Sequence, residues 1–170
     1  MSYVFYNSLE IVGDADDFKK ILEVTNGGEN EFGEKLIFDF QKIIPMPENI
    51  RSEYFQMLKE DQSIKIDYSD IEKLDKRYEV IGQYLEWCYD NWGCKFDPWN
   101  EKIIDGAIIK FQTVNGRAVP LITELSRQFP SLKLIYQSLC ETPDFDYVYS
   151  IQGGEVIDLS KCEHYGSFDK

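Results

Sequence analysis

The chain has 170 residues, of which 43% are hydrophobic and 15% aromatic, a composition that predicts one packed domain and excludes a disordered acidic chain. Acidic residues outnumber basic ones by 31 to 18, which gives a formal net charge of −13. A charge of this size opposes direct binding to nucleic acid or to an anionic membrane surface. The expected partner is therefore a basic protein.

The ends of the chain and its cysteines indicate a compartment. The N-terminal residues show no basic segment followed by an apolar core, and no apolar run approaches about 18 residues, so we expect neither a signal peptide nor a membrane span. The four cysteines are then expected to be reduced thiols of a cytoplasmic protein, with Cys88 in the core.

The first elements are a strand and a helix. Alternating side chains predict a strand over Tyr3–Val12, which Gly13 ends. Asp14 is a typical N-cap residue for the helix that follows, and Asn26–Gly28 ends that helix. A second strand is expected over Lys35–Phe40, where apolar and polar residues again alternate.

The middle of the chain predicts two helices. The first, over Arg51–Gln62, has a weak pattern; it follows a rigid extended segment that contains Pro45 and Pro47. The second begins at a capping box formed by Ser69 and Glu72. Its apolar residues recur every three or four positions and predict one buried face of about five turns: Ile71, Leu74, Tyr78, Ile81, Leu85, Cys88 and then Trp92. The charged residues between Glu72 and Glu79 belong mostly to the wet face.

The C-terminal part predicts further strands around one helix. A third strand is expected over Ala107–Val114, a helix from Pro120 to Phe129, and a fourth strand over Leu132–Leu139. Phe145–Ile151 and Glu155–Leu159 predict a final hairpin across a Gly-Gly turn.

Together these elements predict an α+β fold of the ferredoxin-like type, with a mostly antiparallel sheet and helices packed on one face, because the strands alternate and hairpin turns crowd the C-terminus. We expect one domain over residues 1–159 and a C-terminal tail over residues 160–170.

The search for chemistry finds no catalytic, cofactor-binding or metal-binding motif. The only histidine, His164, lies in the tail beside Cys162, and two such neighbours without a second pair of ligands are a weak metal signal. The glycine pairs lack the surroundings of a phosphate-binding loop. The aromatic residues between Trp87 and Trp99 are expected to serve the core and its loops, or alternatively to expose an anchor at a protein interface.

Four segments carry a resemblance to a known family: Asn7–Asp14 (NSLEIVGD), Phe38–Pro47 (FDFQKIIPMP), Asn91–Asp97 (NWGCKFD) and the helix from Pro120 that ends at Phe129–Pro130. In this order they resemble the ferredoxin-like family typified by the plasmid-borne YubB protein, over about residues 3–150. The resemblance implies a ferredoxin-like fold and a setting on phages, plasmids and integrated elements. It implies no activity.

The negative charge is concentrated near the two ends of the chain. Residues 10–34 carry a net −6 and residues 139–170 a net −5, which leaves −2 for the rest. We expect these stretches either to be two solvated surfaces or to meet in one anionic face that attracts a basic partner. The candidate partner-binding residues are Asp14, Asp16, Asp17, Glu29, Glu31, Glu34, Glu141, Asp144 and Asp146.

The leading functional hypothesis is a non-enzymatic binding protein from a mobile element, an inhibitor of a basic host nuclease or defence complex that imitates nucleic-acid phosphates. The alternatives are an immunity protein against a basic toxin and an enzyme of unknown type. An enzyme would gather several carboxylates, such as Asp97, Asp105 and Asp144, in one pocket.

Overall fold

The computed structural model describes residues 2–29, 33–63, 71–140 and 146–161. The helices are α1 (Ala15–Thr25), α2 (Phe40–Ile43), α3 (Glu48–Ser63), α4 (Ile71–Asn91) and α5 (Val119–Gln128). The strands are β1 (Val4–Val12), β2 (Trp99–Ile104), β3 (Ile108–Val114), β4 (Lys133–Cys140), β5 (Tyr147–Gln152) and β6 (Glu155–Lys161). The described part of the chain is thus an α+β protein.

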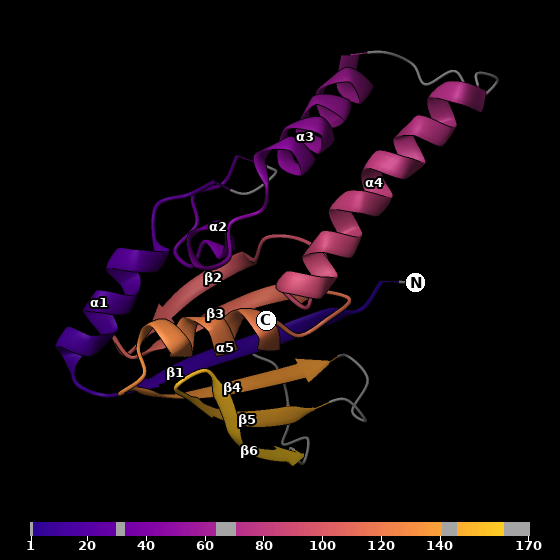
Figure 1. The fold of residues 1–170 in the computed structure, drawn as a ribbon. Helices are drawn as coiled ribbons and strands as arrows, with labels where there is room; N and C mark the ends of the chain where they lie inside the picture. Colours follow the sequence, from indigo (N-terminus) through magenta and orange to yellow (C-terminus); the bar gives the residue numbers. More distant parts are fainter. Residues whose placement is uncertain (1, 30–32, 64–70, 141–145, 162–170) are drawn as a thin grey trace.

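The six strands form one antiparallel sheet in the order β2-β3-β1-β4-β5-β6. In β1 the buried side chains alternate with more exposed ones, so one face of the sheet meets the helices (Figure 1). The predicted α+β class and antiparallel sheet are therefore confirmed, while the narrower ferredoxin-like assignment stays a prediction.

Aromatic side chains fill the space between the sheet and the helices. Phe38, Phe40, Trp92 and Phe111 are all buried and contact one another edge to face or tilted, with ring centroids 5.2–5.9 Å apart. The Trp92 Nε1–H donates a hydrogen bond to the carbonyl of Ile44 at 2.9 Å. This bond ties the end of α4 to the segment after α2.

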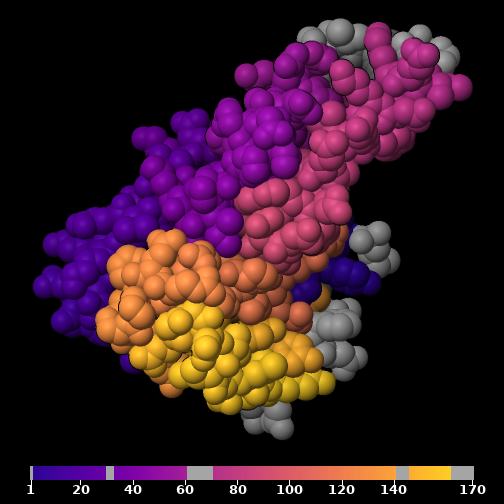
Figure 2. All heavy atoms as spheres, in the orientation of Figure 1, coloured from indigo at the N-terminus to yellow at the C-terminus, as the bar shows by residue number. Residues whose placement is uncertain are grey.

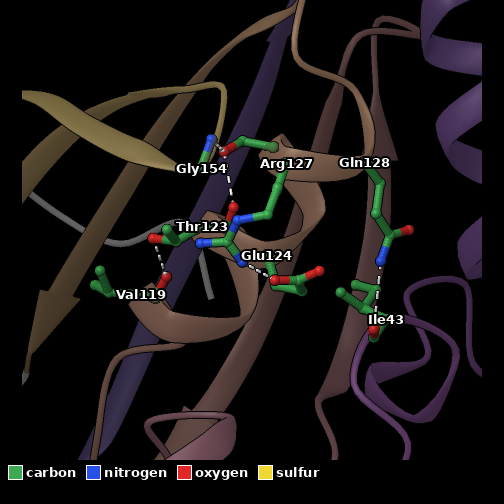
Figure 3. Close-up of polar contacts among 8 residues, drawn as sticks. Ile43, Val119, Thr123, Glu124, Arg127, Gln128 and Gly154 are labelled. Carbon is green, nitrogen blue, oxygen red and sulfur yellow. Dashed lines mark hydrogen bonds and ion pairs between the residues drawn. The ribbon is translucent and has the colours of Figure 1, made fainter.

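Helix α5 holds two other segments in place. The side chain of Gln128 donates to the carbonyl of Ile43 at 3.4 Å, and the Gly154 N–H donates to the Ser126 hydroxyl at 2.8 Å (Figure 3). Gly154 has φ +84° in the β5–β6 turn, a conformation that favours glycine. The predicted final hairpin is confirmed and is fastened to α5.

The expected strand over Lys35–Phe40 is wrong. Residue Lys35 makes one isolated bridge with Glu29, and α2 begins at Phe40. The backbone N–H groups of Ile37 and Phe38 donate to the carboxylate of Glu101, at 2.6 and 2.8 Å, instead of to a neighbouring strand. A side chain thus replaces the ladder bonds that the alternating pattern implied.

Strand β2 was not predicted. Its residues Trp99–Ile104 lack an alternation of apolar and polar side chains, and its pairing with β3 is interrupted between Trp99 and Lys102. Asn100 has φ +52°, which marks the irregularity.

Helices α3 and α4 form an arm that projects from the sheet (Figures 1 and 2). They pack against each other where the Tyr54 and Tyr84 rings stack at 3.8 Å. Farther out, the predicted burial of the α4 apolar residues is wrong at two positions: Ile71 is 69% exposed and Tyr78 is 70% exposed. The predicted capping residue Ser69 lies outside the described residues.

The predicted C-terminal boundary of the domain lies close to the end of the last strand. Strand β6 runs to Lys161, two residues past the expected end at residue 159. Within the described residues, no helix is long and apolar enough to cross a membrane. Cys88, Cys94 and Cys140 are buried, and Cys162 and His164 lie outside the described residues.

Candidate protein-binding surfaces

The first predicted acidic residues form the start of α1. The Asp14 carboxylate accepts hydrogen bonds from the N–H groups of Asp16 and Asp17, at 2.9 and 3.0 Å, and Asp17 in turn accepts from the Asp14 N–H. Asp17 also pairs with Lys20 at 3.2 Å, and this carboxylate raises the pKa of the lysine. Two of the three carboxylates therefore have a local structural task, and Asp16 is left exposed.

The other predicted acidic residues differ in exposure. Glu29 and Glu34 are exposed near the end of α1. Asp146 is fully buried, and its carboxylate accepts a hydrogen bond from the Cys140 N–H at 2.8 Å. Glu31, Glu141 and Asp144 lie outside the described residues.

The two ends of the chain do not bring Asp14 and Asp146 together. Val12, next to the start of α1, pairs with Lys133, whereas Phe5 pairs with Cys140, the backbone partner of Asp146. At about 3.4 Å per residue, these two ends of β1 lie on the order of 24 Å apart. The expectation of a single anionic face made by both ends is wrong for this pair of residues.

Two carboxyl groups under the arm have a raised pKa. Burial raises the pKa of Asp39 and of Glu101, and the charge of Asp39 adds to the effect on Glu101. Both carboxylates are engaged with backbone: Asp39 accepts from the Gln41 N–H at 2.9 Å as the N-cap of α2, and Glu101 holds the two N–H groups described above. These contacts give both carboxylates a structural role, because each one satisfies backbone N–H groups.

One face of α4 has a different character. At 3.6 residues per turn, nine residues fall within about a third of the helix circumference, and all nine are exposed. We call them the α4 outer face: Ile71, Glu72, Asp75, Tyr78, Glu79, Gly82, Glu86, Tyr89 and Asp90. Five are acidic and none is basic, because the three basic residues of α4 fall outside this sector.

Large apolar side chains lie among these carboxylates. Ile71 and Tyr78 are about seven-tenths exposed, and Tyr89 is 39% exposed. Together they place an aliphatic and two aromatic side chains along the helix, each beside acidic neighbours. Exposed aromatic side chains are enriched among the residues that anchor protein interfaces.

Gly82 lies in the middle of the outer face. A Cβ added there would meet nothing within 4 Å, so no packing inside the described protein requires a glycine. Glycine in an exposed helix interior costs about 0.8–1.0 kcal/mol relative to alanine. Its effect is to leave the backbone of α4 open to close approach between Tyr78 and Tyr89.

Sequence reasoning placed Glu72, Asp75 and Glu79 on a wet face and did not single them out. The signal was present, since Glu72, Glu79 and Glu86 repeat every seven residues. The exposure of Ile71 and Tyr78 could not be found, because the pattern assigned both to the buried face. Within the described residues, no group of three or more potential ligands is placed to hold a metal ion.

Comparisons with known proteins inform the fold. No family model matches the chain, and no curated protein matches it. A solved structure that does match is the crystal structure of the protein api92 from Yersinia pseudotuberculosis, of the family DUF1281. The match has a TM-score of 0.52 at 10% identity and covers 99% of this chain and 100% of that one. At this identity the likeness shows the fold alone, and the YubB-type assignment stays a prediction.

Proposed function

We propose that this protein is a non-enzymatic binding module that docks a basic partner protein through the α4 outer face. The observation that carries the proposal is the exposed sector of nine residues with five carboxylates, no basic residue and three large apolar side chains. The partner surface is expected to supply lysines or arginines around an apolar contact.

The two kinds of side chain have different tasks in this proposal. The carboxylates on a molecule of net charge −13 attract a basic partner over several ångströms and raise the rate of encounter. Ile71, Tyr78 and Tyr89 provide apolar area that leaves water on binding. The arm projects from the rest of the molecule (Figure 2), and its helix α4 carries both kinds of side chain on the outer face.

A narrower form of the proposal retains the mobile-element hypothesis. Nucleases and other nucleic-acid-binding proteins carry basic surfaces, so an acidic module that covers such a surface inhibits its owner. Support for this form comes from the charge and from the resemblance to the YubB-type family. Neutralisation of a basic toxin belongs to the same class and differs in the identity of the partner.

The test is affinity capture from a lysate of the source cells, at low and at high salt, with two matched double variants. The first, Glu79→Gln with Glu86→Gln, removes two charges from the α4 outer face. The second, Glu23→Gln with Glu53→Gln, removes two exposed charges from α1 and α3. We expect wild type and the second variant to capture the same basic protein at low salt. The first variant should capture at least tenfold less of it, and high salt should release it from all three.

The identity of the retained protein separates the narrower forms, since a nuclease or defence subunit and a toxin are distinguishable by mass spectrometry. If both variants retain the same proteins in the same amounts as wild type, the α4 outer face is not the binding surface and the proposal fails.

A further inference from the structure

We infer that the segment which docks on α4 is a basic helix that lies along it in the manner of a coiled coil, with lysines or arginines repeated every seven residues. This inference rests on the proposed function and adds the conformation and charge spacing of the partner. It comes from the order of residues along the α4 outer face.

The α4 outer face, together with the neighbouring Leu85, has the spacing of a heptad seam. Ile71, Tyr78 and Leu85 are spaced by seven residues, and Asp75, Gly82 and Tyr89 form a second row with the same spacing, offset by four. Rows offset in this way have the spacing of the two core rows of a coiled coil, and four of these six residues are apolar. Leu85 is half-buried and the other five residues are exposed, so the seam is open from Ile71 to Tyr89, a length of about 27 Å.

The glutamates occupy the flank of this seam. Glu72, Glu79 and Glu86 each directly follow a residue of the first row. In coiled coils, residues at this flanking position form ion pairs with the partner helix and determine which partner is accepted. Three acidic residues in register therefore select a helix with three basic residues in register.

Gly82 fits a helical partner better than an extended one. The backbone groups of a helix interior are already hydrogen-bonded, so an extended segment gains no ladder of hydrogen bonds on α4. A helix instead packs side chains into the partner's surface at an axis separation of about 8–10 Å. The space above Gly82, between Tyr78 and Tyr89, receives a large side chain of such a helix.

A second copy of this chain is a poor occupant of the same face. Two antiparallel copies, related by a two-fold axis perpendicular to α4, would place the glutamate rows against each other, and like charges at these positions repel. Charge complementarity therefore favours a different, basic helix.

The probe is a labelled synthetic peptide of three heptads, with leucine in the two core rows and lysine at both flanking positions. Its isomer has the same composition, with the lysines moved to the outer side of the helix. Fluorescence anisotropy gives the Kd of each peptide for the full-length chain. We expect the flanking-lysine peptide to bind at least tenfold more tightly than the isomer.

Charge exchange provides the second arm. The protein variant Glu79→Lys with Glu86→Lys is expected to bind the lysine peptide at least tenfold more weakly than wild type does. The same variant is expected to bind a matching peptide with glutamate at the flanking positions, which wild type does not bind. Binding of the glutamate peptide by this variant requires that the exchanged residues pair directly with the peptide. If the two glutamates had only a structural role, the exchange would not restore binding.

Equal affinity for the two isomers, no binding of either, or no rescue by charge exchange overturns the helix inference. Suppose that both isomers bind equally, and that the Glu79→Gln, Glu86→Gln variant binds neither peptide and no longer captures the partner protein. The proposed function then stands, and only the inference that the partner segment is helical is overturned. If capture fails as well, both fall.

Discussion

The two halves of α4 follow one periodic pattern but have different surroundings. Near the sheet, Tyr84 and Cys88, and Trp92 directly after the helix, are buried in the core. In the outer half, Ile71 and Tyr78 continue the pattern and are mostly exposed. The difference shows that a periodic apolar stripe predicts a helix and a face, while the neighbours in space decide whether that face is covered.

The buried residues near the sheet have contacts within the protein that explain them. Tyr84 stacks on Tyr54, Trp92 contacts Phe40 and donates to Ile44, and Gly93 after the helix has φ +80°. The outer half has three residues whose cost is unexplained within the described chain: Ile71 and Tyr78 expose apolar area, and Gly82 weakens the helix. Residues that a fold does not need are candidates for binding.

The largest expected effect is at Trp92, directly after the inner half of α4. Trp92→Ala removes a fully buried ring and the hydrogen bond to Ile44, so we expect a loss of about 3–5 kcal/mol in the free energy of unfolding. Urea denaturation followed by circular dichroism measures it. A loss below about 1 kcal/mol would show that the end of α4 is less firmly packed than the contacts indicate.

The next effect lies beneath the arm, at Glu101. Glu101→Gln retains one acceptor and turns an amide N–H₂ toward the other backbone donor, so we expect a loss of about 1–3 kcal/mol. Glu10→Gln, an exposed change on β1, is the matched control and should cost less than about 0.5 kcal/mol.

The raised pKa of Glu101 makes this difference depend on pH. Because the folded protein holds the proton more tightly than the unfolded chain, whose pKa is near 4.5, the wild-type contribution is lost as the pH rises through the higher folded pKa. As the pH falls from 7 toward about 4.5, wild type gains stability that the Gln variant does not gain. Denaturation at several pH values should show the gap between the two proteins widening; a constant gap would contradict it.

A smaller effect of opposite sign is expected at the boundary between the two halves. Gly82→Ala places a methyl group in open space and improves helix propensity, so we expect a gain of about 0.8–1.0 kcal/mol. Thermal unfolding measures it, with Gly93→Ala as the contrast. A Cβ at Gly93 would lie 2.3 Å from the Arg117 carbonyl oxygen, and its φ is +80°, so that variant should lose stability.

Much of the fold followed from local patterns. The strand before Asp14, the capping of α1 and the hairpin after β4 were predicted because neighbouring residues in the sequence determine them. Non-local contacts decided what was missed. The Lys35–Phe40 segment depends on a carboxylate 63–64 residues away, and β2 depends on its pairing with β3.

The binding surface was predicted in kind but not in place. Charge indicated a basic partner, yet the candidate residues near the chain ends include helix caps and the buried Asp146. The acidic row of α4 was masked by interspersed lysines, since net charge along the sequence averages over opposite faces of a helix. Sorting residues by face rather than by sequence interval recovers it.

The smallest effect on stability is expected at Tyr78. It separates the exposed outer half of α4 from the buried inner half most clearly. Tyr78→Ser removes a mostly exposed ring, so the free energy of unfolding should change by less than about 0.5 kcal/mol, against several for Trp92→Ala directly after the same helix. Affinity for the captured partner should nevertheless fall at least tenfold, because an exposed aromatic anchor contributes only when a partner covers it. A stability loss comparable to that of Trp92→Ala would mean that Tyr78 belongs to the core, whereas unchanged affinity would leave its exposure without a functional reason.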